Sequence, residues 1–223
     1  VVMPQSQSRE KIELLDLYGA DLRLVTATSY SDPNHYIHTA RRLAESLNES
    51  EPNGAIWARQ FDNTANTDIH ERTTGQEIWQ QTAGNIDGFI CAVGTGGTLA
   101  GVSRALKAHK PEITIGLADP KGSSLYNYFT NGELRGEGRS ITEGIGISLV
   151  TDNLRLANID QAFEINDAEA LPYIFDMLRH RKLGPGHTIV TILCDYGDRY
   201  KSKLFNPVFL ENMGLPAPDW TRN

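Results

Sequence analysis

The chain has 223 residues, of which 39% are hydrophobic, enough to bury a core as one large domain or two small ones. Acidic residues outnumber basic ones by 28 to 21, and the net charge of −7 makes nucleic acid and anionic membranes poor candidate partners. No apolar run approaches the ~20 residues that span a bilayer, so the sequence predicts no transmembrane helix.

The N-terminal residues predict short strands and two helices. Residues 1–3 have the pattern of the second half of a strand, and we therefore expect the chain to be incomplete. A helix is predicted over residues 9–18 and a strand over residues 22–26. Asp32 is the expected N-cap of a second helix, because Pro33 follows it and apolar residues recur at helical spacing as far as Leu47.

The middle of the chain carries the clearest pattern. Within residues 87–102, an apolar run long enough for a buried strand ends at a glycine-threonine loop, and a helical pattern begins at once. This helix is expected to end near residues 109–111, and residues 113–118 form another buried-type strand. Two such strands around one helix indicate a βαβ unit, and hence a parallel sheet with a right-handed crossover.

The C-terminal part alternates between irregular and regular patterns. Residues 121–165 are rich in glycine and predict irregular structure. Asp167 is the expected N-cap of a helix, which Gly184-Pro185-Gly186 breaks. Residues 187–194 have the pattern of a buried strand, and the tail over residues 195–223 is expected to wrap over the surface.

An anion site is predicted at one glycine-rich loop, Gly94-Thr95-Gly96-Gly97-Thr98. A loop between a buried strand and a helix directs backbone N–H groups and the positive end of the helix dipole at one point, which suits a phosphate. Leu99 stands where a dinucleotide fingerprint needs glycine or alanine, and no Lys-Ser/Thr pair follows Gly101 as in a P-loop. Two alternatives remain open: a phosphate site of another kind, or a tight turn with no ligand.

Two further segments have alternative interpretations. Gly144-Ile145-Gly146 is either an ordinary flexible loop or a segment whose backbone approaches a ligand closely. Gln60 and Asn63 either form a plain turn or present side-chain amides to a substrate carboxylate. The residue pattern alone leaves both questions open.

The histidines and cysteines predict no metal site. His70 lacks the second histidine of a zinc-hydrolase motif, and His35 and His38 have no third ligand. Cys91 and Cys194 lie in separate apolar runs without Cys-x-x-Cys spacing. We interpret these two cysteines as buried free thiols of a protein from a reducing cytosol.

Six motifs follow one another along nearly the whole chain. They are MPQSQSREK from Met3, QFDN from Gln60, TTGQEIW from Thr73, VGTGGTLAGV from Val93, EGIG from Glu143, and GPG from Gly184 with TILCD from Thr191. In this order, they resemble the cysteine synthases (O-acetylserine sulfhydrylases), fold-type II enzymes that use pyridoxal 5′-phosphate (PLP).

The resemblance implies an α/β fold like that of the tryptophan synthase β chain, with mostly parallel sheets and flanking helices. Residues 1–45 would be the remnant of a smaller N-terminal domain, and residues 46–223 a larger domain that binds the PLP phosphate, with the active site between them. The phosphate would lie on Gly94, Thr95, Gly96, Gly97 and Thr98. The substrate would contact Gln60, through its carboxylate, together with Gly144 and Gly146.

The reaction that the resemblance implies is a β-replacement, in which acetate leaves O-acetylserine and sulfide adds to give L-cysteine. A cystathionine β-synthase or another β-replacing PLP enzyme is the alternative within the family. The family also implies a cytoplasmic homodimer and serine acetyltransferase as a possible protein partner.

Three family motifs are missing from this sequence. We find no Ser-x-Lys-Asp-Arg motif, which carries the Schiff-base lysine, and no substrate-binding Ser-Gly-Asn-Thr-Gly loop. A Gly-x-Ser-Ser-Gly stretch, expected between His180 and Arg181, is also absent. We therefore assign no catalytic residue. We expect the present sequence to be part of a longer enzyme and to lack a segment of it between residues 180 and 181. The alternative is a non-catalytic protein built on the same fold.

Overall fold

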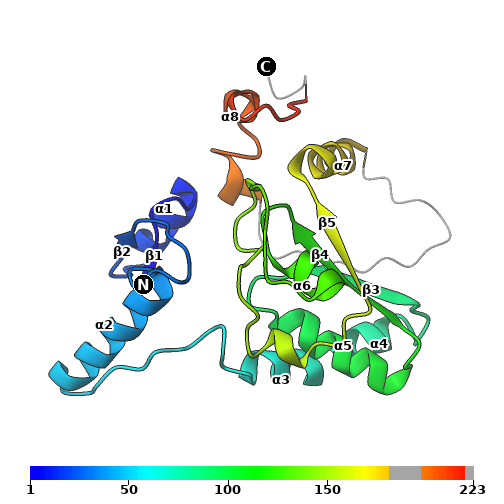
Figure 1. Ribbon diagram of the computed structural model, residues 1–223, viewed down its shortest axis with the longest axis horizontal. Coiled ribbons are helices and arrows are strands. Elements are labelled where there is room, and N and C mark those ends of the chain that lie inside the picture. The colour runs from blue at the N-terminus through cyan, green and yellow to red at the C-terminus, as the bar shows by residue number, and fades with distance from the viewer. Residues whose placement is uncertain (181–196, 219–223) are drawn as a thin grey trace. The chain divides into compact units, whose positions relative to one another are not determined.

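The structure is a computed structural model that describes residues 1–180 and 197–218 (Figure 1). It divides into two compact units. Unit 1 comprises Val1–Ala58 and the described part of Cys194–Asn223, and unit 2 comprises Arg59–Leu193. The boundary that the sequence suggested near residue 45 falls inside helix α2 (Tyr36–Ser50), whereas the structure divides the chain after Ala58.

Unit 1 contains the two N-terminal strands as a parallel pair. β1 (Val2–Pro4) pairs with β2 (Arg23–Val25), and α1 (Arg9–Leu17) connects them. Strands were predicted at both places, and the structure has them within about one residue of the predicted bounds. The tail adds η2 (Gly197–Tyr200) and α8 (Pro207–Asn212).

Helix α2 begins later than the sequence predicts. Asp32 does not cap it, because the Asp32 carboxylate accepts the N–H of Asn34 at 2.7 Å and so closes a local turn. The N-cap is His35, whose ring Nδ1 accepts the N–H of Ile37 at 3.4 Å. The Asp-Pro signal therefore marks a turn at residues 32–34, just before the helix.

Unit 2 is built on a three-stranded parallel sheet. Its order is β3 (Gly88–Ala92), β4 (Thr114–Pro120), β5 (Gln161–Ile165), and α5 (Gly97–His109) connects β3 to β4. The predicted α/β fold with a parallel βαβ unit is thus confirmed. β5 was not predicted, because it lies in the glycine-rich stretch and several of its residues are exposed, which leaves no buried-strand pattern.

Three helices pack together on one side of this sheet in Figure 1: α3 (Ala65–Arg72), α4 (Thr74–Gln81) and α5. A β-carbon on Gly101 of α5 would collide with the backbone of α3, so glycine is what lets these two helices approach closely. The core between helices and sheet consists of buried aliphatic side chains and one phenylalanine, among them Phe89, Leu99, Val102, Leu106, Ile115 and Leu117.

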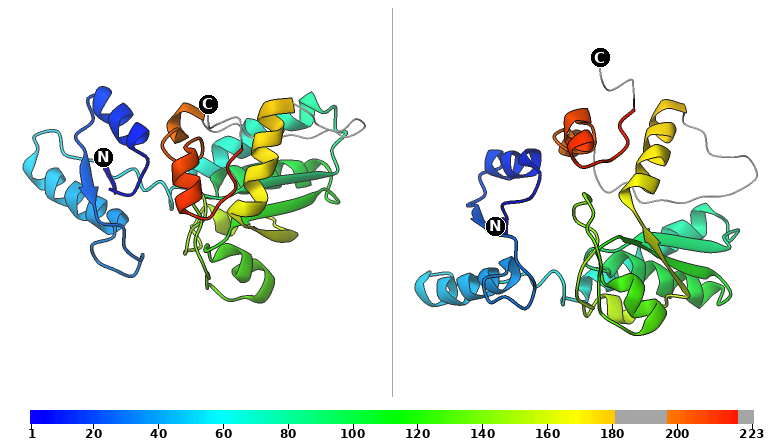
Figure 2. Two further views of the ribbon diagram at one scale, coloured as in Figure 1. Left: turned by 90° about the horizontal axis from the view of Figure 1, so that it is seen from above. Right: turned by 45° about the horizontal axis from the view of Figure 1, so that its top comes forward.

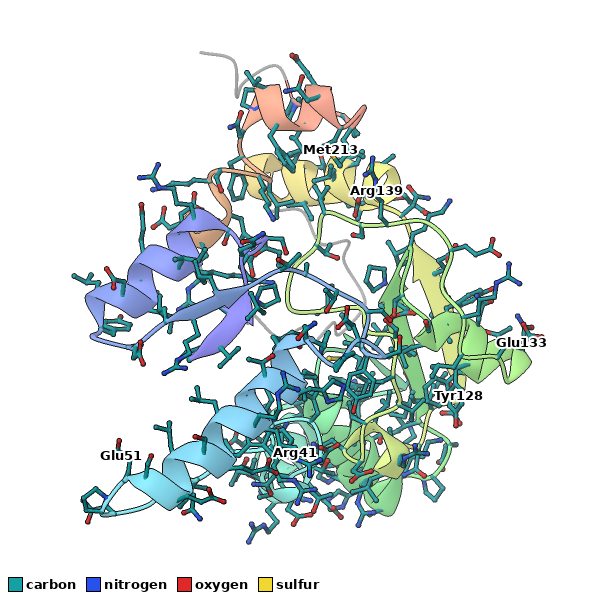
Figure 3. The ribbon with its side chains drawn as sticks, turned by 60° about the vertical axis from the view of Figure 1, so that its left-hand side comes forward. Arg41, Glu51, Tyr128, Glu133, Arg139 and Met213 are labelled. Atoms are coloured by element: carbon teal, nitrogen blue, oxygen red, sulfur yellow. The ribbon has the colours of Figure 1, made fainter. Side chains whose placement is uncertain are left out.

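The stretch predicted to be irregular contains two short elements besides β5, α6 (Leu125–Asn131) and η1 (Leu154–Leu156). α6 was missed because its first turn is stabilised from outside, by the buried Asp119 carboxylate that accepts the N–H of Tyr126 at 2.7 Å. A long irregular loop runs from α6 to η1 (Figure 2). Figure 3 labels Tyr128 on α6, Glu133 just after α6 where this loop begins, and Arg139 farther along it.

The helix predicted to start at Asp167 is α7 (Asp167–His180), but Asp167 is its first residue and not its N-cap. The cap is Asn166, whose Oδ1 accepts the N–H of Glu169 at 2.9 Å. The Asp167 carboxylate accepts bonds from Ser140 Oγ at 2.5 Å and from the N–H of Ile141 at 2.9 Å, and so joins the long loop to the start of α7. The predicted Gly184-Pro185-Gly186 break, the predicted strand over 187–194 and Cys194 lie outside the described residues.

Candidate functional site

The glycine-threonine loop (residues 94–98) forms the junction between β3 and α5, as the sequence predicts. Gly96 is the N-cap of α5 and has a φ of 88°, a left-handed conformation that favours glycine. The first helical bond runs from the N–H of Ala100 to the Gly96 carbonyl at 2.9 Å. Among the described residues, no protein acceptor faces the N–H groups of Thr98 and Leu99, which leaves them for an anion at the positive end of the helix dipole.

Close packing makes glycine necessary at three positions of this loop. A β-carbon on Gly94 would overlap the carbonyl oxygen of Gly144, and one on Gly97 would overlap the side chain of Asn66. At Gly96 it would lie 2.7 Å from the β-carbon of Leu154. The loop is therefore a tight cradle of backbone, and a larger residue at any of these positions would push it away from the segments packed against it.

The hydroxyl of Thr95 is oriented by its neighbours. Its Oγ1 accepts a hydrogen bond from Asn66 Nδ2 at 2.9 Å and a long one from the N–H of Gly97 at 3.5 Å. Because this oxygen already accepts two hydrogen bonds, its own proton is available to a further acceptor. An anion at the start of α5 would be such an acceptor.

The hydroxyl of Thr98 belongs to a short hydrogen-bond chain. Thr98 Oγ1 lies 3.2 Å from His70 Nε2, and His70 Nδ1 lies 2.8 Å from Thr74 Oγ1. Burial lowers the pKa of His70, so its ring is neutral near neutral pH and carries one N–H. If Thr74 donates to Nδ1, then Nε2–H donates to Thr98, and the Thr98 proton is left for an anion.

The 144–146 segment lies directly against this loop. The N–H of Gly146 donates to the carbonyl of Val93 at 2.9 Å, and the carbonyl of Gly144 sits above Gly94. Both glycines have a positive φ, 81° at Gly144 and 78° at Gly146. The structure thus brings together two of the predicted site segments, and both present backbone rather than side chains.

Thr151 fastens the cradle from behind. Its side chain is 1% exposed, its Oγ1 donates to the carbonyl of Thr95 at 2.6 Å, and it accepts the N–H of Leu154 at 2.9 Å. The position of Thr95 is therefore set by a hydroxyl that lies more than fifty residues away in the sequence.

Gln60 lies in a turn at the start of unit 2. The N–H groups of Asp62 and Asn63 both donate to the carbonyl of Arg59, at 2.9 and 2.8 Å. Gln60 is exposed, and the turn is joined to the rest of unit 2 by Asn153, whose Nδ2 donates to the Phe61 carbonyl at 2.8 Å. No sequence signal predicts the residues whose side chains hold this site in place, because each of them reaches it from a segment distant in the sequence. They are Asn66, His70, Thr151 and Asn153.

The residues present fit a phosphate group. Backbone N–H groups at the start of α5, the Thr95 hydroxyl, the Thr98 hydroxyl when His70 Nε2–H donates to it, and the helix dipole all favour a dianion. Within residues 1–180 and 197–218, no group of three histidine, cysteine or acidic side chains could bind a metal ion. None of the described helices combines the length and the apolar character that crossing a membrane requires.

Comparison with known families identifies one match that covers most of the chain. Residues 1–191 match the family described as "Pyridoxal-phosphate dependent enzyme". A phosphate carried by a small aromatic cofactor is consistent with the cradle of glycine backbone and threonine hydroxyls.

Several similar proteins are named cysteine synthases. Cysteine synthase 2 of Schizosaccharomyces pombe is 41% identical over 250 residues, which covers 96% of this chain and 63% of that protein. Cysteine synthase 1 of Emericella nidulans is 42% identical over 240 residues, covering 96% and 64%. Cysteine synthase A of Salmonella typhi is 33% identical over 236 residues, covering 95% and 71%. The chain thus spans less than two thirds of the length of the two fungal relatives.

Proposed function

Because the chain belongs to the pyridoxal-phosphate dependent enzymes, in the family of the cysteine synthases, we propose that it is the phosphate-binding part of an enzyme that makes L-cysteine. The proposed reaction is the replacement of the acetate of O-acetylserine by sulfide. The observation that carries the proposal is the cradle at residues 94–98, which fits a phosphate dianion and sits on the family's parallel sheet.

The cofactor would be held by its phosphate. The N–H groups of Thr98 and Leu99 and the hydroxyls of Thr95 and Thr98 would donate to the phosphate oxygens. Each of these donors is fixed before the ligand arrives, which reduces the entropy lost on binding. When bound, PLP supplies an electron sink that labilises the β-substituent of an amino acid.

The amino-acid substrate would be held by its carboxylate. We propose that the side-chain amide of Gln60 donates to this carboxylate, and that Gly144 and Gly146 present backbone to the same molecule. Glycines with positive φ permit such a close approach, because a β-carbon would add both bulk and strain.

PLP binding tests the first part of this proposal. We expect the longer protein, which includes the Schiff-base lysine motif missing from these residues, to bind PLP. Its visible absorbance should be abolished by borohydride reduction. Thr98→Val keeps the shape of the side chain but removes the hydroxyl, and it should weaken PLP binding about tenfold, whereas Thr98→Ser should keep it. Equal affinity of Thr98→Val and the unaltered protein would contradict the placement of the phosphate.

Turnover tests the second part. We expect O-acetylserine to change the absorbance of the bound cofactor, and sulfide to release L-cysteine. Binding of PLP without any response to O-acetylserine or to serine would instead favour a non-catalytic protein on the same fold, and a preference for serine with a thiol nucleophile would favour a cystathionine β-synthase.

We also propose a cytoplasmic homodimer that can associate with serine acetyltransferase. This rests on the similarity to cysteine synthases alone. Sedimentation of the intact protein, alone and with serine acetyltransferase, tests the oligomeric state and the association. A monomer that forms no complex with serine acetyltransferase would contradict both.

A further inference from the structure

Asn153 is a fully buried polar side chain near the candidate site that the proposed function does not use. Its exposed fraction is 0%, and Thr67 of α3, its main partner, is also 0% exposed. A buried primary amide must satisfy both its oxygen and its nitrogen, because an unpaired polar group in the core is costly. Asn153 satisfies both.

The two ends of this amide bind two different elements. Its Oδ1 accepts from Thr67 Oγ1 at 2.8 Å and from the N–H of Thr67 at 3.2 Å. Its Nδ2 donates to the carbonyl of Phe61 at 2.8 Å and, at 3.5 Å, to that of Gln60. The side chain therefore bridges the rigid helix α3 and the turn that carries Gln60.

The turn has few other restraints. The bonds from Asp62 and Asn63 to the Arg59 carbonyl are internal to it, and Arg59 itself has a φ of 52°, which is strained for a residue with a β-carbon. Among the described residues outside 59–66, only Asn153 forms a hydrogen bond to residues 59–63, and the remaining bonds to the turn come from Ala65 and Asn66 next to it in the chain. Without that bridge, the turn would lose its tertiary anchor.

The same segment also holds the phosphate loop. Thr151, two residues before Asn153, donates to the Thr95 carbonyl at 2.6 Å. Within residues 151–153, the Thr151 side chain therefore holds the phosphate loop and the Asn153 side chain holds the Gln60 turn. Residues 151–153 thus connect the phosphate loop and the Gln60 turn through one short segment.

We propose that Asn153 is a positioning residue for the amino-acid substrate: it holds the Gln60 turn against α3 so that the Gln60 amide meets the substrate carboxylate at a fixed distance from the phosphate loop. The inference rests on the proposed function. Asn153 itself touches no substrate, so its effect should appear in amino-acid binding and not in PLP binding.

A double-mutant cycle in the intact, PLP-loaded protein tests this proposal. Asn153→Asp keeps the acceptor for Thr67 but loses the donor to Phe61, and Asn153→Ala removes the bridge without adding a buried charge. We expect each variant to weaken O-acetylserine binding, measured from the cofactor's absorbance, about tenfold while PLP affinity stays unchanged. Added to Gln60→Ala, either change should weaken binding no further, because both act through the same amide.

Two controls separate this role from a general loss of stability. Ser103→Ala removes the hydrogen bonds of another fully buried polar side chain of unit 2, whose hydroxyl bonds to Ala100 and Asn158, and should leave O-acetylserine binding unchanged. Hydrogen exchange of the Asp62 and Asn63 amides should be faster in Asn153→Ala than in the unaltered protein.

The outcomes are distinct. Additive effects of Gln60→Ala and Asn153→Ala, or an equal loss of PLP affinity, would overturn the positioning role. If the unaltered protein binds PLP but no amino acid, the proposed function fails. In that event, unchanged exchange at Asp62 and Asn63 in Asn153→Ala would overturn the anchoring as well, and faster exchange would support it.

Discussion

Helices α5 and α2 differ in how the N–H groups of their first turns are paired. Every helix begins with N–H groups that have no partner within the helix. At α2, His35 closes this end with its own ring nitrogen, 3.4 Å from the N–H of Ile37. At α5, the N-cap is Gly96, no side chain caps the helix, and Asn66 and His70 orient the nearby hydroxyls from another helix.

The difference separates a capped helix from a binding site. A cap formed by the helix's own residue occupies the space where a ligand would bind. Glycines keep that space open at α5, while support from α3 and residues 151–153 keeps the loop in place. The open N-terminus of α5 thus depends on close packing behind the loop. Each prediction below changes either the open end of α5 or the capped end of α2.

The largest effect is expected from displacing the phosphate loop. Gly94→Ala places a β-carbon on the Gly144 carbonyl, which is backbone and cannot rotate away, so we expect a loss of about 3 kcal/mol in the free energy of unfolding and no PLP binding. Gly132→Ala is the control: a β-carbon there meets nothing within 4 Å, and only the φ of 78° is unfavourable, so this change should cost about 1 kcal/mol and keep PLP binding. Urea unfolding and PLP titration measure both, and full PLP affinity in Gly94→Ala would contradict the cradle.

A smaller effect is expected from loosening the loop from behind. Thr151→Val keeps the shape but leaves the Thr95 carbonyl and the Leu154 N–H without their partner, at a cost of about 2 kcal/mol in unfolding free energy, and PLP should bind more weakly. Ser103→Ala removes a similarly buried hydroxyl, on α5, and should lower stability alone. Equal PLP affinities of the two variants would show that support from residue 151 does not reach the ligand.

The smallest effect concerns the closed helix end. Burial, and then the charge of His38, lowers the pKa of His35 below its ordinary value of 6.5. The unfolded chain therefore binds more protons just below that value, and stability falls as the pH drops through this range. His35→Asp supplies an acidic cap beside the helix dipole, and should add about 0.5 kcal/mol at neutral pH and remove this dependence.

Urea unfolding of the unaltered protein and of His35→Asp, above and below pH 6.5, checks this expectation. A steeper loss of stability on acidification in the variant than in the unaltered protein would contradict a role for the His35 ring as a cap. PLP binding at α5 should be the same in both proteins, because residue 35 lies in unit 1 and the phosphate loop in unit 2.

The sequence predicts those parts of unit 2 whose signal is local. The apolar run of β3, the glycines after it and the periodicity of α5 lie within about twenty residues, and together they indicate a strand, an anion site and a helix in the right order. α7 has a similar local signal and was also predicted. β5 and α6 have none, since an exposed strand lacks the pattern and α6 takes its cap from Asp119.

The sequence by itself thus determines that a phosphate-binding turn follows β3, because glycine, threonine and a helix start are sufficient to make one. Only the tertiary structure decides what holds that turn open. Asn66, His70 and Thr151 each reach it from a separate segment, and Asn153 ties the Gln60 turn to the same framework. Hydrogen bonds of this kind need only one polar atom at the right place in space, and no periodicity in a chain records where distant segments will meet.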